Sequence, residues 1–264
     1  MQIREQKVAV GRYSLSLKSA GTGTPTVIMD AGAGDTSESW ATIQPHVASF
    51  TQVCTYDRAG TGQSDVGPTP TTSRQIVHEL HLLLINAHIP SPYVLVGHSF
   101  GGLNMRLYAS YYPDEVVGMV LVDSAHEAMY AHLDIPTPLD GTDYTTSAQQ
   151  VRATQSLDDR PLIILSHGLF MPGVPEAVTQ MWLPCQKKLA HLSSNSVLVI
   201  ATKSGHFIQA DQPEIVIEAI RQVVEAVRNQ SHALPPCEET FRRFDGLCVD
   251  AENDELDLSS KQTH

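Results

Sequence analysis

Apolar runs of membrane-spanning length are missing from this 264-residue chain. Its apolar stretches, such as residues 116–122, are far shorter than the ~20 residues that a transmembrane helix needs. Basic residues are also scarce, because 17 Lys and Arg stand against 29 Asp and Glu, for a formal net charge of −12. Such a surface repels nucleic-acid phosphates and anionic membranes, so we expect no nucleic-acid partner. The short apolar runs predict no membrane span.

Cysteine is too sparse to dominate the fold. Four cysteines do not make the dense disulfide framework of a small secreted domain. Cys237 and Cys248 are close enough in sequence to pair, but the redox compartment decides whether they do, and that pairing stays open. Residues 1–7 are polar and lack the apolar stretch of a signal peptide, so we expect a cytoplasmic protein.

Short apolar runs alternate with amphipathic segments through most of the chain. Strands are predicted at residues 6–10, 13–18, 26–30, 52–56, 93–97, 116–122, 161–165 and 196–200, and helices at 73–87, 101–111, 175–192 and 212–228. The continuously apolar strands are typical of strands covered on both faces. Their alternation with helices predicts an α/β protein with a parallel sheet.

Two polar segments interrupt this alternation. Residues 127–160 are predicted to form a cap or lid between two parts of one core, residues 1–126 and 161–230. Residues 231–264 are acidic and are predicted to form a C-terminal tail outside that core.

Residues 97–101 read Gly-His-Ser-Phe-Gly, between a predicted strand and a predicted helix. In that setting the pattern Gly-x-Ser-x-Gly is typical of a nucleophile on a sharp, strained strand-to-helix turn. Side chains at Gly97 and Gly101 would collide across the turn, and the following helix N-terminus presents N–H groups to a developing oxyanion. Ser99 is therefore predicted to be a nucleophile rather than an ordinary helix cap.

With residues 56–64 and the later pair Gly205-His206, this motif resembles the α/β-hydrolase fold-1 family over about residues 1–230. The resemblance implies a mostly parallel, eight-stranded sheet flanked by helices, with a small cap inserted after the sixth strand. It also implies hydrolysis of carboxylic esters or related acyl compounds.

A serine nucleophile needs a base, and His206 is the predicted one among twelve histidines. It follows the last predicted strand, and this fold orders its residues as nucleophile, acid and histidine. The backbone N–H groups of Phe100 and Ala33 are predicted to form the oxyanion hole. Family members often carry His-Gly where this chain has residues 31–32, so the hydrogen bonds that hold this loop stay open.

Two further polar residues near the motifs are predicted to be structural. His98, beside the nucleophile, is interpreted as a packing or supporting residue. Arg58, in the glycine-containing loop after the strand at residues 52–56, is interpreted as tying loops together rather than as contacting substrate.

The acid is the least determined member of the predicted triad. Its common family position follows the strand at residues 161–165, but the first carboxylate after that strand is Glu176. Some relatives carry the acid after the preceding strand, where Asp123 lies. Asp123 is the favoured acid, and Glu127 and Glu176 remain alternatives.

Together these features predict a serine hydrolase that cleaves small to medium carboxylic esters or lactones through an acyl-enzyme on Ser99. A small-molecule ester is the expected partner, no metal or organic cofactor is implied, and no oligomeric state is predicted. The alternatives are a non-hydrolytic ligand-binding receptor and an acyltransferase on the same fold. An epoxide hydrolase or dehalogenase would need a carboxylate nucleophile in place of Ser99.

Overall fold

The computed structural model describes residues 2–133, 136, 138–229 and 233–251. In those ranges one sheet holds nine strands in the order β1-β2-β4-β3-β5-β6-β7-β8-β9. The strands are β1 (Arg4–Ala9), β2 (Ser14–Ala20), β3 (Thr26–Asp30), β4 (Val53–Tyr56), β5 (Tyr93–His98), β6 (Val116–Val122), β7 (Leu162–His167), β8 (Ser196–Ala201) and β9 (Gly246–Val249). The central strands β4, β3, β5, β6, β7 and β8 run parallel to one another. At the two edges, β1, β2 and β9 run antiparallel to their neighbours.

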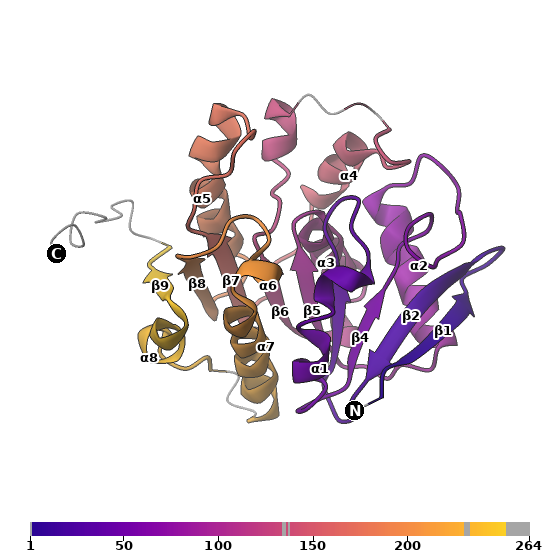
Figure 1. Cartoon of the computed structure of the whole chain (residues 1–264), viewed down its shortest axis with the longest axis horizontal. Coiled ribbons are helices and arrows are strands. Elements are labelled where there is room, and N and C mark those ends of the chain that lie inside the picture. The colour runs from indigo at the N-terminus through magenta and orange to yellow at the C-terminus, as the bar shows by residue number, and fades with distance from the viewer. Residues whose placement is uncertain (1, 134–135, 137, 230–232, 252–264) are drawn as a thin grey trace, which may run out of the picture.

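Helices cover both faces of the sheet (Figure 1). One face carries α1 (Gln44–Val47), α6 (Ile208–Asp211), α7 (Pro213–Arg228) and α8 (Cys237–Phe241), and the other carries α2 (Ser73–Asn86), α3 (Phe100–Tyr111), α4 (Tyr144–Val151) and α5 (Glu176–Ala190). Short 3-10 turns are η1 (Ser37–Trp40), η2 (Pro113–Glu115), η3 (Met129–His132) and η4 (Arg242–Phe244). No helix within the described ranges is both long enough and apolar enough to cross a bilayer.

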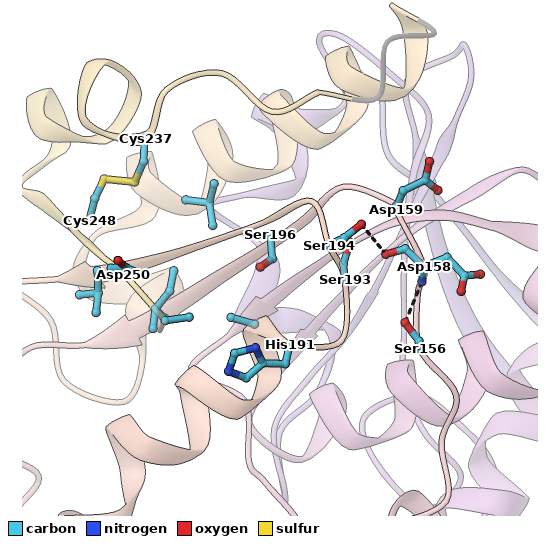
Figure 2. A pocket seen from close by; sticks show the side chains of 15 residues that line it. Ser156, Asp158, Asp159, His191, Ser193, Ser194, Ser196, Cys237, Cys248 and Asp250 are labelled. Carbon is cyan, nitrogen blue, oxygen red and sulfur yellow. Dashed lines mark hydrogen bonds between the residues drawn. A yellow bond between two sulfur atoms is a disulfide. The ribbon is translucent and has the colours of Figure 1, made fainter. Parts of the chain in front are cut away.

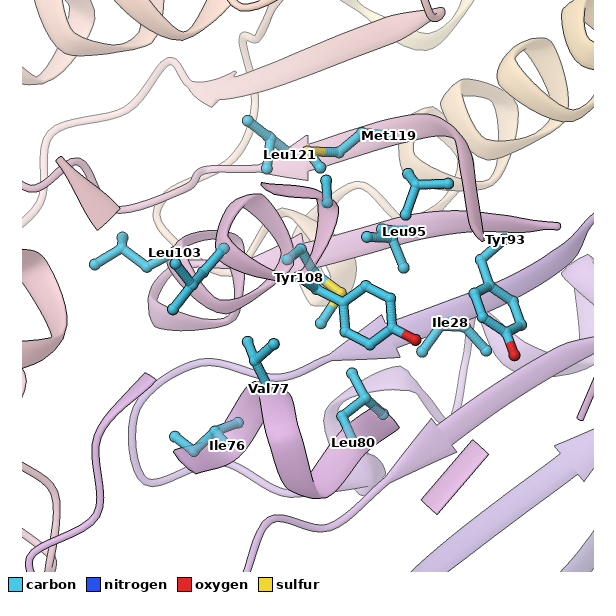
Figure 3. Close-up of a cluster of buried hydrophobic side chains, with 14 of the residues drawn as sticks. Ile28, Ile76, Val77, Leu80, Tyr93, Leu95, Leu103, Tyr108, Met119 and Leu121 are labelled. Atoms are coloured by element: carbon cyan, nitrogen blue, oxygen red, sulfur yellow. The ribbon is translucent and has the colours of Figure 1, made fainter. Parts of the chain in front are cut away.

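Two apolar clusters sandwich the sheet because successive strand residues point to opposite faces. In β3, Val27 and Met29 join the cluster under α7, whereas Ile28 joins the cluster under α2 and α3. Figure 3 shows the latter cluster, in which Ile28 lies among side chains such as Leu80 and Tyr108. The two clusters confirm the prediction of strands covered on both faces. Burying each large apolar side chain stabilises the fold by about 1.5–3 kcal/mol.

The ninth strand corrects the expected count of eight. β9 comes from the segment predicted to be a tail, and it pairs with the outer edge of β8. Phe241 (2% exposed) packs in the apolar cluster under α7, and a disulfide joins Cys237 to Cys248. Without β9, the outer edge of β8 would present unpaired backbone N–H and C=O groups, and the pairing with β9 satisfies them. Residues 230–232 and 252–264 of this part of the chain lie outside the described residues.

The carboxyl ends of the parallel strands bring distant parts of the sequence together. β5 ends directly before Ser99, β6 directly before Asp123, and the loop after β8 contains His206. Above this end of the sheet lie α4, from the segment between β6 and β7, and the start of α5, which are both at the top of Figure 1. The topology therefore places the three predicted residues at one end of the sheet, where α4 and the start of α5 cover them.

Candidate active site

Ser99 occupies the strained turn between β5 and α3. Its backbone has φ 52° and ψ −118°, a region that costs a residue other than glycine about 1–3 kcal/mol. A Cβ on Gly97 would lie 2.6 Å from the carbonyl oxygen of Gly101, and one on Gly101 would press against the Asp30 carbonyl. The structure confirms why both flanking positions of the motif are glycine.

Asp123 and His206 are in direct contact. Asp123 follows β6 with φ 43° and is 0% exposed. Its Oδ2 lies 2.6 Å from Nδ1 of His206. Ser99 and His206 line the same cavity. The structure thus brings together the three residues that the sequence predicted, from the ends of three strands.

The charge state of Asp123 determines the tautomer of His206. Burial alone raises the pKa of the Asp123 carboxyl, but hydrogen bonds from His167 and His206 outweigh it and lower the pKa to about 2. The group is therefore ionised near neutral pH and can only accept hydrogen bonds. Nδ1 of His206 must carry the shared proton, which leaves Nε2 with a free lone pair.

The two alternative carboxylates lie elsewhere. Glu127 is paired with Arg106, whose two terminal nitrogens lie 2.8 and 3.3 Å from its oxygens. Glu176 begins α5, is exposed, and accepts a hydrogen bond from Gln180 at 2.9 Å. Among the hydrogen bonds of the described residues, neither carboxylate reaches His206.

A buried cation holds the loop after β3. Nη1 of Arg58 donates to Asp30 at 2.6 Å and to the Ala31 carbonyl at 2.7 Å, and Nη2 donates to the Gly32 carbonyl. Asn104 of α3 donates to the other oxygen of Asp30 at 2.8 Å. The structural role predicted for Arg58 is confirmed. These bonds also supply the loop support that the departure at residues 31–32 left open.

The predicted oxyanion donors are the backbone N–H groups of Phe100 and Ala33. Phe100 is the first residue of α3, so its N–H has no partner within the helix. Ala33 lines the cavity together with Ser99 and His206. The N-terminus of α3 also supplies positive potential beside Ser99, where charge would develop on an acyl oxygen.

His98 supports the loop that contains His206. It is buried, and its Nε2 lies 2.9 Å from the backbone oxygen of His206. Because a carbonyl only accepts hydrogen bonds, Nε2 of His98 must carry a proton. In the neutral ring, Nδ1 therefore carries none. Burial, with the repulsion of His206, lowers the pKa of His98 to about 4. The predicted supporting role of His98 is confirmed.

The cavity at Ser99 has a volume of about 320 Å³. It is lined by Ala33, Ser99, Ala125, Met129, Tyr130, Leu133, Tyr144, Met171, Gly173, Val174, Pro175, Val178, Trp182 and His206. Four of these residues come from the predicted cap at 127–160, and six come from residues 171–182. The loop after β7 and α5 therefore contribute more lining residues than the predicted cap does, although the sequence analysis did not predict that they cover the cavity.

Sequence reasoning also missed two side chains that contact Asp123. His167 ends β7 and Trp182 lies in α5, and both donate hydrogen bonds to the Asp123 carboxylate. The one signal for His167 was its place at the strand end where relatives commonly carry the acid. Nothing distinguished Trp182 from an ordinary buried aromatic residue of an amphipathic helix.

A larger hollow lies away from Ser99, beside the disulfide of Cys237 and Cys248 (Figure 2). Its volume is about 920 Å³, and its polar lining includes Ser156, Asp158 and His191. None of the predicted site residues lines it. The smaller cavity at Ser99 is therefore the candidate active site.

Comparisons with known proteins agree with this architecture. A sequence profile for the alpha/beta hydrolase fold matches residues 25–171. "Uncharacterized protein YqjL" of Bacillus subtilis (strain 168) is 32% identical over 227 residues, which cover 81% of this chain and 89% of that protein.

Two solved structures share the fold at low identity. A thermophilic esterase from Thermogutta terrifontis superposes with TM-score 0.62 and 19% identity, covering 86% of this chain and 99% of the esterase. The enol-lactonase from Burkholderia xenovorans LB400 superposes with TM-score 0.64 and 16% identity, covering 83% and 100%. At these identities the likeness is one of fold.

Proposed function

The chain belongs to the alpha/beta hydrolase fold family, and from this premise we propose that it is a serine hydrolase of carboxylic esters or lactones. The observation that carries the proposal is the hydrogen bond between Asp123 and His206, because His206 and Ser99 line the same cavity. A buried carboxylate that holds an imidazole in one tautomer, beside a strained serine, is the arrangement that activates a hydroxyl as a nucleophile.

The first half of the reaction follows from the tautomer of His206. Nε2 accepts the proton of the Ser99 hydroxyl while Oγ forms a bond to the ester carbonyl carbon. The carbonyl oxygen becomes an oxyanion and accepts hydrogen bonds from the backbone N–H groups of Phe100 and Ala33. His206 then gives the proton to the departing alcohol oxygen as the ester C–O bond breaks, and Ser99 is left acylated.

The second half repeats these roles with water. His206 takes a proton from water, whose oxygen attacks the acyl carbon. The bond to Ser99 then breaks and Oγ recovers the proton, releasing the carboxylic acid. With a lactone, acid and alcohol leave as one hydroxy acid.

The cavity supports a small to medium, uncharged acyl group. No Asp, Glu, Lys or Arg side chain stands among its fourteen described lining residues, so a charged acyl group would be buried without a partner. At about 30 Å³ for each non-hydrogen atom, 320 Å³ holds about ten such atoms. The wall is mostly aliphatic, thioether and aromatic, which matches an apolar chain.

Covalent labelling with a fluorophosphonate tests the proposal. The probe is expected to add once per chain, at Ser99, because only an activated hydroxyl reacts readily. Ser99→Ala is expected to lose both the adduct and the hydrolysis of nitrophenyl esters. An adduct that persists in Ser99→Ala would contradict the assignment, as would a wild-type protein that takes up no probe.

Product analysis separates hydrolysis from acyl transfer. With a nitrophenyl ester in water, we expect one equivalent of free carboxylic acid for each nitrophenol released. If nitrophenol release required an added alcohol or amine and yielded its acylated form, the protein would be an acyltransferase using the same residues.

A further inference from the structure

The Asp123 carboxylate accepts hydrogen bonds from more than His206. Oδ2 lies 2.6 Å from Nδ1 of His206, while Oδ1 accepts the backbone N–H of His167 and the indole N–H of Trp182, each at 2.9 Å. Nδ1 of the His167 ring lies 2.9 Å from both carboxylate oxygens. Because Asp123 is fully buried, these groups replace the water that an ionised carboxylate would otherwise bind.

His167 and Trp182 approach Asp123 from elements that carry none of the three proposed reacting residues. His167 ends β7, and the backbone N–H of Asp123 donates to Leu165 of that strand at 2.7 Å. Trp182 lies in α5, with its ring centroid 5.3 Å from that of His167 and 5.5 Å from that of His206. Both side chains are nearly buried, so packing as well as hydrogen bonding holds their donors in place.

The distribution of donors restrains rotation of the carboxylate. The terminal torsion of an aspartate is soft and roughly two-fold, so an unsupported carboxylate can turn its oxygens away from a partner. The backbone N–H of His167 and the indole N–H of Trp182 hold Oδ1. With Oδ1 held, Oδ2 is directed at Nδ1 of His206.

On the basis of the proposed hydrolase function, we propose that His167 and Trp182 are positioning residues that fix the Asp123 carboxylate so that it orients His206 toward Ser99. Both act through Asp123 rather than on the reacting atoms. The ionised carboxylate accepts only, so the ring of His167 must carry its proton on Nδ1, as His206 does. Trp182 also lines the cavity, so the side chain that bounds the acyl group also holds the acid.

Substitutions that remove one donor at a time test this role. His167→Leu removes the ring donor and Trp182→Phe removes the indole N–H while keeping an aromatic ring. Each is expected to lower kcat by about 10- to 100-fold. For His167→Leu, KM should stay within about 3-fold of wild type, because His167 does not line the cavity and a misdirected acid leaves substrate binding intact. His167→Asn keeps a side-chain N–H near the position of Nδ1 and should recover kcat to within about 5-fold of wild type.

Trp40→Phe is the matched control for the tryptophan variant. Trp40 is fully buried, and its Nε1 has no hydrogen-bond partner among the described residues. Its replacement should leave kcat unchanged. Rates are expressed per active site titrated with fluorophosphonate, so that unfolded molecules do not lower the apparent kcat.

A double-mutant cycle separates positioning from an independent structural effect. In an Asp123→Ala background, His167→Leu should cost less than about 2-fold more in kcat, since the group it positions is gone. An equal loss in both backgrounds would overturn the proposal. A fully active His167→Leu variant would overturn it for that residue, and a fully active Trp182→Phe variant would do so for Trp182.

The tautomer of His167 gives a readout that does not depend on turnover. Long-range ¹H–¹⁵N spectra of the wild type should show the ring proton on Nδ1 of both His167 and His206. A proton on Nε2 of His167 would contradict the positioning role even in an active protein. Failure of the wild type to react with fluorophosphonate would instead count against the proposed hydrolase function.

Discussion

At the residue scale, the carboxylate of Asp123 is where the site is most sensitive to a change of a single atom. Asn in its place keeps the size of the side chain but favours the tautomer of His206 with the proton on Nε2. In a well-studied serine protease the corresponding change costs about 10⁴ in rate. We expect Asp123→Asn to lower kcat on a nitrophenyl ester by about two to four orders of magnitude with little change in folding.

Glu176→Gln is the matched control for that prediction. Glu176 is exposed at the start of α5, where its charge suits the helix dipole. Its replacement should leave kcat within about ten-fold of wild type. If Glu176→Gln abolished activity while Asp123→Asn did not, the acid would have been assigned to the wrong strand end.

His98 predicts how stability depends on pH. Its pKa is about 4 in the folded protein, against about 6.5 in an unfolded chain. Between these values the unfolded state binds more protons, so stability is fully present above about pH 6.5 and falls as the pH drops toward 4. We expect this residue to lower the free energy of unfolding by about 2 kcal/mol between pH 7 and pH 5.

Urea unfolding of His98→Gln at the two pH values measures this effect. Gln keeps a donor for the His206 carbonyl but does not titrate, so about 2 kcal/mol of the pH dependence should disappear. His191→Gln, which removes an exposed histidine, should leave the pH dependence as in wild type. If the free energy of unfolding depended on pH identically in wild type and His98→Gln, the lowered pKa of His98 would be contradicted.

At the element scale, α5 is the part that sequence patterning described least fully. Its amphipathic spacing predicted the helix, and the observed bounds Glu176–Ala190 agree with residues 175–192. The pattern could not indicate that its N-terminal half roofs the cavity. A helix face that covers a ligand cavity has the same apolar spacing as one that covers core.

Val178 of α5 predicts the acyl-chain preference. It is buried, lines the cavity, and loses two methyl groups in Val178→Ala. Each buried methylene is worth about 0.8 kcal/mol, or about four-fold in binding, so kcat/KM for an ester about two carbons longer should rise about 4- to 10-fold. A panel of nitrophenyl esters of increasing chain length measures this shift.

Val216→Ala is the control for the chain-length experiment. Val216 lies in α7 and is equally buried, but under the opposite face of the sheet. This change should lower stability and leave the preferred chain length as in wild type. An unchanged preference in Val178→Ala would mean that the acyl group binds elsewhere.

At the scale of the whole molecule, the net charge of −12 predicts discrimination between substrates by charge. A negative surface field lowers the local concentration of anionic esters, and salt screens that field over about 10 Å at 0.1 M. Raising NaCl from about 20 to about 200 mM should increase kcat/KM several-fold for an ester whose alcohol portion carries a free carboxylate. It should leave kcat/KM for a neutral ester of equal length unchanged.

The neutral ester serves as the internal control for that measurement. Equal salt responses of the two esters would indicate an effect on the protein rather than on encounter with substrate. A lack of response for both would indicate that the surface charge lies too far from the cavity entrance to matter.

The sequence alone determined the features that depend on neighbouring residues, because local backbone geometry and burial leave a direct pattern in the sequence. The strained turn at Ser99 was predictable because a sharp turn between strand and helix demands glycines at Gly97 and Gly101. The central strands were predictable because burial on both faces makes them continuously apolar. Chain order within the family then indicated His206, whose contact with Asp123 the structure supplies.

Only the tertiary structure decided the features that depend on distances between remote segments. The packing of β6, β7 and α5 against one another decides which carboxylate contacts His206. It also decides that His167 and Trp182 donate hydrogen bonds to that same carboxylate. The ninth strand and the Cys237–Cys248 disulfide depend on the open edge of β8. A periodic pattern indicates which face of an element is buried but carries no information about its partner, which packing alone selects.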